Sequence, residues 1–214
     1  MNFINSINST IGAIILAGGN SSRISTPKAF IQIGDKSIIE LIVAKLTNVF
    51  QKIVIVTNSR PEYRNVCSQY KQIELISDVI IGKGPLGGIY SGLLKNYDME
   101  YNFVIGCDMP FLNVNLIRYM VNNVNGYDVV IPKINGFIEP LHAIYSTSCL
   151  PVIKAQLDCN NLALRSILKN TARVKFIEQA EIEEFCRNPE ESFFNINNDK
   201  DLEIVKSGKY KVLN

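Results

Sequence analysis

The sequence has little net charge and no long apolar run. Its 22 Lys and Arg residues against 20 Asp and Glu residues give a formal net charge of +2 over 214 residues. This small excess argues against a general nucleic-acid-binding or membrane-surface protein. No apolar run reaches the roughly 18 residues that a membrane helix needs. Residues 1–11 are polar and lack a basic start before an apolar core, so we expect no secretion signal.

Cysteine pairs of the metal-binding type are also missing. The five cysteines are odd in number, and none of them forms a C-x-x-C pair. This usage argues against a structural zinc site and indicates a reducing compartment, so we expect the protein in the cytoplasm. The cysteines are Cys67, Cys107, Cys149, Cys159 and Cys186.

Internal repeats, low-complexity tracts and linker-like stretches are absent from the sequence. A hydrophobic fraction of 47% and a charged fraction of 20% are typical of a globular chain that can bury a sizeable core. The length favours about one domain. We therefore predict a short N-terminal tail over residues 1–10 and a single domain over residues 11–214.

The first stretch with chemical character is GAIILAGGNSSRISTPKA, residues 12–29. It begins as an apolar run without helical periodicity, which predicts a buried strand of a parallel sheet. Gly18 and Gly19 end this strand, and glycines allow a tight turn whose N–H groups can cradle phosphate oxygens. Arg23 and Lys28 add the positive charge that a triphosphate needs. The stretch predicts phosphate binding at the carboxyl end of the first strand, although an ordinary glycine turn with surface basic residues would look similar.

Apolar strands and amphipathic segments alternate along the rest of the chain, which predicts an α/β fold. Asn135-Gly136 predicts a β-hairpin whose returning strand spans residues 137–145. Ser37 predicts a helix N-cap, with Glu40 three residues further on. The predicted strands are 53–56, 73–76, 101–106, 127–131 and 173–176, and the predicted helices are 37–50, 61–70, 89–94, 114–124, 150–157, 162–168 and 182–185.

Two aspartates follow predicted strands. Asp78 precedes a second glycine loop, residues 82–88, whose N–H groups lie at the start of a helix. Asp108 ends the strand at 101–106, where a carboxylate suits Mg²⁺, although turn and cap aspartates are also common. His142 is the only histidine and has no nucleophile near it in sequence, so we expect it to be packed or exposed rather than catalytic.

These motifs, taken in order, resemble those of the molybdenum cofactor guanylyltransferases, a family of nucleotidyltransferases. They match neither the Walker loop nor the dinucleotide fingerprint. Where the family usually has Met-Gly after the arginine, this chain has Ile24-Ser25, and Thr26-Pro27 replaces another frequent pair. The matching segments are Leu16-Ala17-Gly18-Gly19 with Arg23 and Lys28, Gly84-Pro85-Leu86-Gly87-Gly88 with Gly92, Cys107-Asp108-Met109-Pro110-Phe111, Glu139-Pro140-Leu141-His142-Ala143, and FNINNDKDL at 194–202.

The resemblance implies a Rossmann-like, three-layer nucleotidyltransferase fold, whose mostly parallel sheet carries a β-hairpin addition. It also implies catalytic roles for Arg23, Lys28 and Asp108, with Mg²⁺ held by Asp108. A further ligand position falls at Thr57 or Asn58, and we take Asn58. The residues implied for GTP are Leu16, Ala17, Gly18, Gly19, Lys28, Asn58, Asp78 and Asp108. Those implied for the pterin side are Asn195 and Asn197, although Asn197 or Asn198 could equally cap the last helix.

The activity implied by the resemblance is transfer of GMP from GTP to the molybdopterin-bound molybdenum cofactor, with release of pyrophosphate. GTP and the cofactor are then small-molecule substrates, without nucleic acid or membrane, and transient contacts with proteins that supply or accept the cofactor are compatible with this activity. One alternative keeps the chemistry and makes the protein a cytidylyl or sugar-nucleotide transferase. Another is a nucleotide-binding regulator that transfers nothing.

Overall fold

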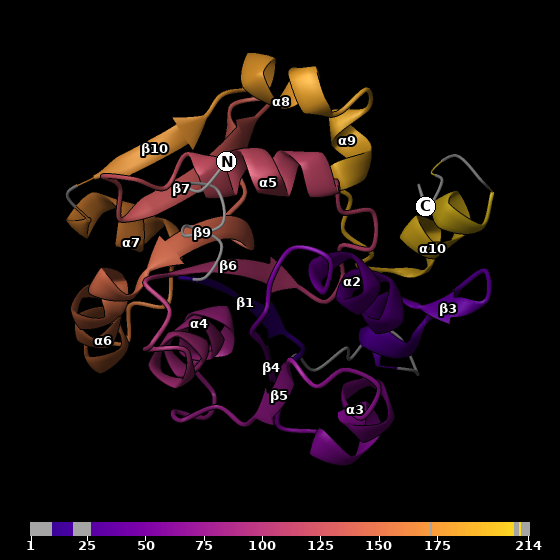
Figure 1. The fold of residues 1–214 in the computed structure, drawn as a ribbon, viewed down its shortest axis with the longest axis horizontal. Helices are drawn as coiled ribbons and strands as arrows, with labels where there is room; N and C mark the ends of the chain where they lie inside the picture. The colour runs from indigo at the N-terminus through magenta and orange to yellow at the C-terminus, as the bar shows by residue number, and fades with distance from the viewer. Residues whose placement is uncertain (1–9, 19–26, 172, 208–209, 211–214) are drawn as a thin grey trace.

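A mostly parallel sheet runs through the centre of the molecule (Figure 1). The computed structural model describes residues 10–18, 27–171, 173–207 and 210. The first four predicted strands are present as β1 (Ile11–Leu16), β4 (Ile53–Val56), β5 (Ile73–Ile76) and β6 (Tyr101–Gly106). They pair in parallel in the order β6, β1, β4, β5, and all of their carboxyl ends therefore meet at one edge of the sheet.

The second half of the chain extends the same sheet, which has the order β10-β7-β9-β6-β1-β4-β5. The predicted hairpin is confirmed: β7 (Val129–Ile134) turns through Asn135 (φ 50°) and Gly136 (φ 78°) into β8 (Phe137–Ile138). The predicted return strand over 137–145 is broken, because the segment around Pro140, which lacks an N–H donor, leaves the ladder. The chain re-enters as β9 (His142–Ser146), antiparallel to both β6 and β7, and β10 (Val174–Ile177) closes the edge parallel to β7.

Helices cover both faces of the sheet and give three layers. Alternate residues of β1 divide between two apolar clusters: Ala13 and Ile15 pack with α2, α3, α5 and α8, whereas Ile14 and Leu16 pack with α4, α6 and α7. The capping box of Ser37 and Glu40 is formed as predicted. The helices are α2 (Ile38–Leu46), α3 (Arg60–Cys67), α4 (Gly84–Lys95), α5 (Val114–Asn122), α6 (Leu150–Asp158), α7 (Arg165–Asn170), α8 (Gln179–Phe185), α9 (Pro189–Ser192) and α10 (Asp199–Lys206). The short 3₁₀ helices are η1 (Lys28–Phe30) and η2 (Thr147–Cys149), and β2 (Gln32–Ile33) pairs with β3 (Lys36–Ser37).

Helix α4 begins earlier than predicted. The second glycine motif was expected as a loop before a helix at 89–94, but Gly84 to Gly88 already form its first turns. Gly92 explains how closely α4 approaches β1, since a Cβ at this position would lie 2.5 Å from Cγ2 of the buried Ile14. Gly88 approaches Leu16 at the end of β1 in the same way, and the first half of α4 therefore packs against the carboxyl end of this strand.

The predicted N-terminal tail, residues 1–10, lies outside the described residues except for Thr10. Among the helices that the structure describes, none is both long enough and apolar enough to cross a membrane.

Candidate functional site at the carboxyl edge of the sheet

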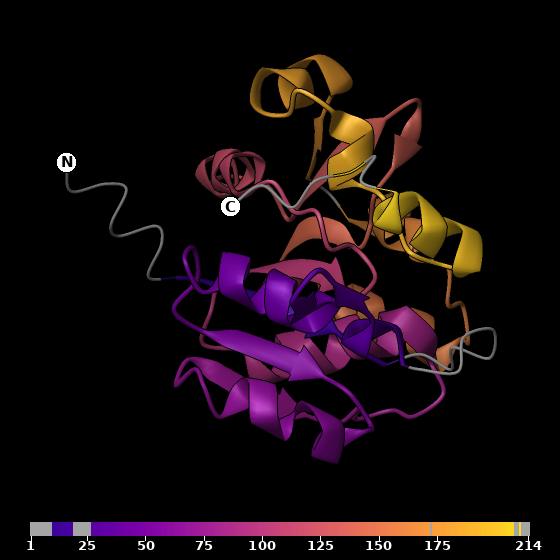
Figure 2. The same cartoon turned by 90° about the vertical axis from the view of Figure 1, so that its right-hand side faces the viewer.

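Three residues from distant motifs meet beyond the carboxyl ends of β1 and β6. The Nζ of Lys28 donates a hydrogen bond of 2.9 Å to Oδ1 of Asn197, and it lies 3.9 Å from Oδ2 of Asp108. Figures 1 and 2 both place α10, which follows Asn197, beside the β2–β3 segment that follows Lys28. The sequence named all three residues as site residues, and the structure brings their side chains together.

Asp108 is positioned by the strand that precedes it and by a glycine. The N–H of Cys107 donates to the carbonyl of Leu16, which holds the end of β6 beside the end of β1. A Cβ at Gly106 would lie 2.7 Å from Oδ1 of Asp108, so only glycine leaves room for this carboxylate to fold back. Burial raises the pKa of the Asp108 carboxyl, and the nearby Lys28 ammonium acts in the opposite direction. A partly exposed carboxylate is thus held close to the Lys28 ammonium.

Asn198, and not Asn197, caps the last helix. The Asn198 side chain accepts hydrogen bonds from the N–H groups of Lys200 and Asp201, and Asp201 completes the capping box. This leaves the Asn197 side chain directed at Lys28. Asn195 is placed differently, because its amide donates to the carbonyl of Phe193 at 3.1 Å.

A second cluster lies where β4 and β5 end. Asn58 and Asp78 are joined by two hydrogen bonds: Nδ2 of Asn58 donates to Oδ2 of Asp78 at 3.0 Å, and the N–H of Asp78 donates to Oδ1 of Asn58 at 3.1 Å. Oδ1 of Asp78 is buried and has no hydrogen-bond partner among the described residues. Burial raises the pKa of the Asp78 carboxyl, and the bond from Asn58 opposes this shift.

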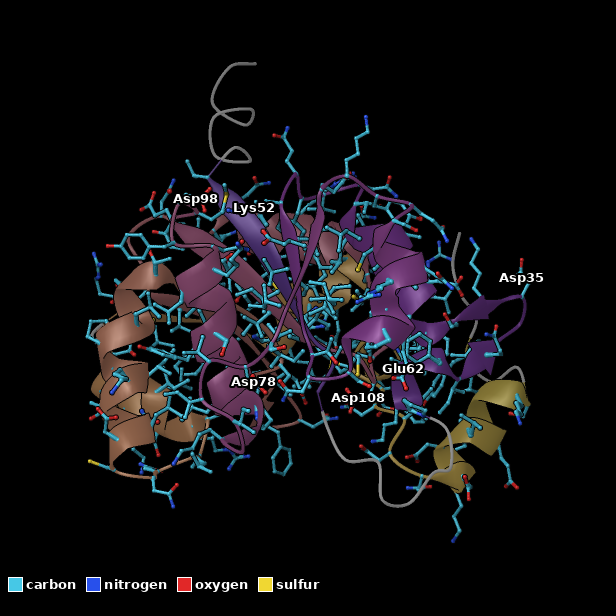
Figure 3. All side chains as sticks on the ribbon, turned by 90° about the horizontal axis from the view of Figure 1, so that it is seen from below. Asp35, Lys52, Glu62, Asp78, Asp98 and Asp108 are labelled. Atoms are coloured by element: carbon cyan, nitrogen blue, oxygen red, sulfur yellow. The ribbon has the colours of Figure 1, made fainter. Side chains whose placement is uncertain are left out.

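The structure places Thr57 and Asn58 differently. Thr57 is buried, and its Oγ1 accepts from the N–H of Ser59 at 3.1 Å. Asn58 is exposed and directed at Asp78. Seen from the edge in Figure 3, Asp78 and Asp108 both lie at the carboxyl end of the strands, whereas Lys52 and Asp98 lie at the opposite end. The polar groups of the two clusters therefore share one edge.

The opening loop is described only at its two ends. Leu16 packs against Gly88, where an added Cβ would lie 3.0 Å from Cδ2 of Leu16, and a Cβ added at Gly18 would meet no atom of the described residues within 4 Å. The hydroxyl of Tyr63 donates to the carbonyl of Ala17 at 3.1 Å and fixes the point where the loop leaves β1. Nothing in the sequence motifs marks Tyr63. Gly19, Arg23 and Ile24-Ser25 lie outside the described residues.

His142 is packed and lies outside the chemistry of this edge, in line with the sequence-based expectation. It is fully buried in β9, with its ring edge-on to Phe103 at 5.1 Å and to Phe193 at 4.9 Å between centroids. Neither ring nitrogen has a hydrogen-bond partner among the described residues. Burial lowers the pKa of His142 to about 3, so the side chain stays neutral at physiological pH.

The buried imidazole makes stability sensitive to acid. Below the unfolded-state pKa of about 6.5, the unfolded chain binds a proton at His142 that the folded chain does not bind until the pH approaches its own pKa of about 3. The free energy of unfolding should therefore fall by about 1.4 kcal/mol per pH unit from this group as the pH drops through 5. In His142→Leu this contribution should vanish, giving a shallower slope in urea unfolding between about pH 6 and pH 4. Identical slopes in the variant and the parent would contradict the assignment.

The described residues contain no cluster of metal-binding side chains at this edge. No group of three or more His, Cys, Asp and Glu side chains suited to a metal occurs within the described ranges. Mg²⁺ is commonly held by one or two carboxylates together with substrate phosphates and water. Asp108, partly exposed and facing the edge, fits that donor set.

An α/β sheet with a lysine, two aspartates and two amides at its carboxyl edge suits a nucleotidyltransferase, and comparisons with known proteins establish that class. The family model of the MobA-like NTP transferase domain matches residues 13–175. A probable molybdenum cofactor guanylyltransferase of Peptoclostridium acidaminophilum is 40% identical over 198 residues, covering 89% of this chain and 86% of that protein. One from Natranaerobius thermophilus is 33% identical, covering 92% and 95%.

Comparison with solved structures agrees with the sequence comparisons. The crystal structure of molybdopterin-guanine dinucleotide biosynthesis protein A from Archaeoglobus fulgidus superposes with a TM-score of 0.78 at 26% identity, covering 92% of this chain and 97% of that one. The chain belongs to the MobA-like NTP transferase family.

Proposed function

We propose that the protein transfers GMP from GTP to the molybdopterin-bound molybdenum cofactor and releases pyrophosphate. The observation that carries this proposal is the convergence of Lys28 and Asp108, 80 residues apart in the chain, with 3.9 Å between Nζ and Oδ2 at the carboxyl edge. Relatives that share up to 40% identity over most of the chain are named as guanylyltransferases of this cofactor, which favours GTP over the cytidylyl and regulator alternatives.

Asp78 is our candidate for reading the base. A carboxylate can accept from both the N1–H and the exocyclic amine of guanine, whereas cytosine has no such edge. The buried Oδ1 of Asp78 is an acceptor without a donor among the described residues. The two hydrogen bonds with Asn58 fix the orientation of this carboxylate before a ligand arrives. Because the carboxylate is already oriented, the Asn58–Asp78 pair can select guanine with little rearrangement of these side chains.

Lys28 is our candidate for the triphosphate. A terminal phosphate oxygen of the pterin cofactor attacks the α-phosphorus of GTP, and the bond from that phosphorus to the leaving pyrophosphate breaks. This exchange needs positioning and charge neutralisation more than covalent help. Lys28, oriented by Asn197, can neutralise charge on the triphosphate. Gly18 and, outside the described residues, Gly19 and Arg23 complete the proposed phosphate site.

Asp108 would hold Mg²⁺ in this proposal. The ion, when bound, supplies charge neutralisation at the phosphates. Burial leaves the ionised form of the Asp108 carboxylate poorly solvated in the free protein, and this raises its pKa. A cation beside it would compensate that cost. Asn195 and Asn197 stay as proposed pterin-side residues, with Asn197 also orienting Lys28.

The setting of the reaction follows from the cysteines and the substrates. All five cysteines are free, which supports a reducing compartment, and we place the reaction in the cytoplasm. A pterin cofactor of this kind passes between enzymes, so transient contact with proteins that supply or accept it is part of the proposal.

Nucleotide choice tests the proposal. The protein should turn over GTP with a kcat/KM far above that for CTP. Asp78→Asn should lower kcat/KM for GTP by about 10- to 100-fold, because a hydrogen bond to a charged group contributes about 1.5–3 kcal/mol. The loss should appear mainly in KM. Asp98→Asn, at the opposite end of the sheet, is the matched control and should leave the kinetics unchanged. Equal turnover of GTP and CTP by the parent protein would favour the cytidylyl alternative instead.

A further inference from the structure

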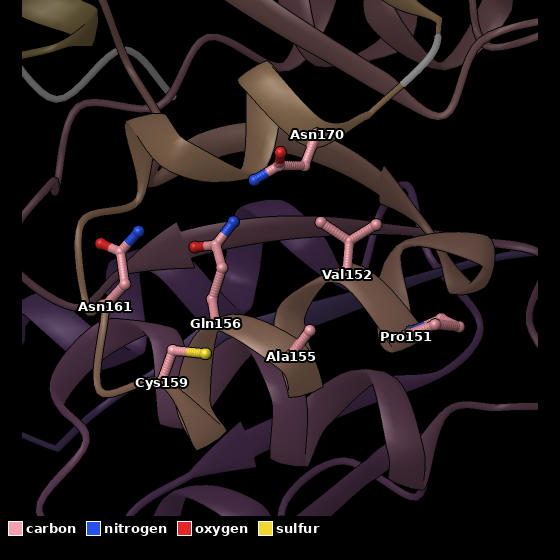
Figure 4. Close-up of a pocket in the computed structure, with 7 residues that line it drawn as sticks. All are labelled: Pro151, Val152, Ala155, Gln156, Cys159, Asn161 and Asn170. Carbon is pink, nitrogen blue, oxygen red and sulfur yellow. The ribbon is translucent and has the colours of Figure 1, made fainter.

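A pocket of about 500 Å³ lies between α6 and α7, apart from the residues proposed for GTP and the cofactor (Figure 4). Its wall is apolar where α6 contributes Pro151, Val152 and Ala155. Three carboxamides face the same space: Gln156 from α6, Asn161 from the connection that follows, and Asn170 at the end of α7. The volume is within the range of small-molecule sites, about 300–1,000 Å³.

Gln156 is the feature that folding alone does not explain. The residue is 5% exposed, and its side chain points into the pocket. Neither Oε1 nor Nε2 has a hydrogen-bond partner among the described residues. Burying an unpaired amide costs free energy, and a leucine would fill the same volume without that cost.

The two neighbouring carboxamides, Asn161 and Asn170, each make a hydrogen bond to the backbone of a residue close in sequence. Nδ2 of Asn170 donates to the carbonyl of Ser166 at 3.2 Å, and Oδ1 of Asn161 accepts from the N–H of Ala163 at 3.4 Å. The N–H of Asn161 donates to the main-chain carbonyl of Gln156 at 2.8 Å, which fixes the turn beneath the side chain. Gln156 is therefore held in place by its backbone, while its carboxamide presents both a donor and an acceptor to the pocket.

The chemistry of the lining defines a ligand class. A carboxamide with a donor and an acceptor side by side is complementary to a cis-amide, as in the N–H and C=O of a lactam ring. None of the described residues that line the pocket carries a charge, which argues against an anionic ligand such as a phosphate. We propose that this pocket is a binding site for a neutral, planar heterocycle with a lactam edge, and that Gln156 reads that edge.

The test uses uracil and 2-pyridone as probes, with 1-methyl-2-pyridone as the matched ligand that lacks the N–H donor. Titration of the full-length protein, followed through the side-chain amide resonance of Gln156 in ¹⁵N-labelled protein, should give saturable shifts at millimolar probe concentration. The N-methylated probe should bind at least about tenfold more weakly, because a site built for a hydrogen bond rejects the analogue that lacks it. The missing resonance in Gln156→Leu assigns the signal.

Two variants separate a ligand site from a hydrated gap. Gln156→Leu should weaken uracil binding at least about tenfold, measured by calorimetry. Gln69→Leu, which removes an exposed glutamine bonded to the carbonyl of Asn65, should leave it unchanged. Both variants should bind GTP like the parent, so the outcome is independent of the proposed function. Absence of saturable binding would show that the pocket only holds water, and equal binding by Gln156→Leu and the parent would show that Gln156 does not recognise the ligand; either result would overturn the proposal.

Discussion

Lys28→Ala is expected to lower kcat/KM for GMP transfer by about one to two orders of magnitude. A charge-assisted hydrogen bond to phosphate contributes about 1.5–3 kcal/mol, and more where charge develops in the transition state. At 1.36 kcal/mol per tenfold, this range corresponds to the stated loss. The side chain is already directed by Asn197, at 2.9 Å, so little reorganisation precedes its contact with a triphosphate. Steady-state kinetics with GTP and the cofactor measure the effect.

Two further lysine variants show how the loss in Lys28→Ala is to be interpreted. Lys28→Arg should rescue poorly, because a planar guanidinium fork does not replace a point charge held by one amide oxygen. Lys36→Ala, at an exposed lysine of β3, is the control and should change the free energy of activation by less than about 0.5 kcal/mol. A loss below about threefold in Lys28→Ala would be the size expected for a solvated surface residue, and the phosphate site would then lie elsewhere.

Asp108→Asn is expected to lower kcat by about 100-fold or more while GTP binding weakens much less. The variant removes the carboxylate proposed to hold Mg²⁺ and so removes charge neutralisation that acts in the transition state. The loss should not be recovered by raising Mg²⁺. Rapid-quench measurement of turnover, together with calorimetric titration of GTP, separates the two effects. Near-normal turnover of Asp108→Asn at low Mg²⁺ would show that Asp108 is only a turn residue and does not hold the ion.

Stability provides the second readout for this variant. Burial raises the pKa of Asp108, so its ionised form costs free energy in the folded protein at neutral pH. Asp108→Asn should therefore keep or raise the melting temperature while activity falls. Asp35→Asn, at an exposed turn distant from Asp108 in Figure 3, is the control and should change neither quantity. A lower melting temperature in Asp108→Asn would indicate that the variant loses activity through loss of folded structure, contrary to this prediction.

Much of the fold could be predicted because local patterns determine it. The apolar run at β4 and the mainly apolar runs at β5 and β6 have the predicted bounds. The interior strands β4 and β6 are buried on both faces and therefore need apolar residues almost throughout, whereas the edge strand β5 is only partly buried and carries Glu74. The hairpin at Asn135-Gly136 was equally readable, because both residues adopt positive φ. The meeting of Lys28 and Asp108 followed from motif order, since parallel strands bring their carboxyl ends to one edge.

What the sequence left open depends on partners distant in the chain. Nothing local shows that Asn58 and Asp78, 20 residues apart, bond to each other, or that Tyr63 reaches the carbonyl of Ala17. Helix α4 starts at Gly84 and holds several glycines although glycines disfavour helices, because Gly88 and Gly92 allow close packing against Leu16 and Ile14 of β1. The division of roles between Asn197 and Asn198 likewise depends on Lys28, whose ammonium lies next to one of them only.

Pyrophosphate release from each of the four nucleoside triphosphates, with and without the molybdopterin cofactor, tests the central claim most directly. If the protein is a guanylyltransferase of this cofactor, release is expected with GTP, only in the presence of the cofactor, and in equal amount to the dinucleotide formed. Release with CTP at a comparable rate, or GTP binding without release when the cofactor is present, would contradict it.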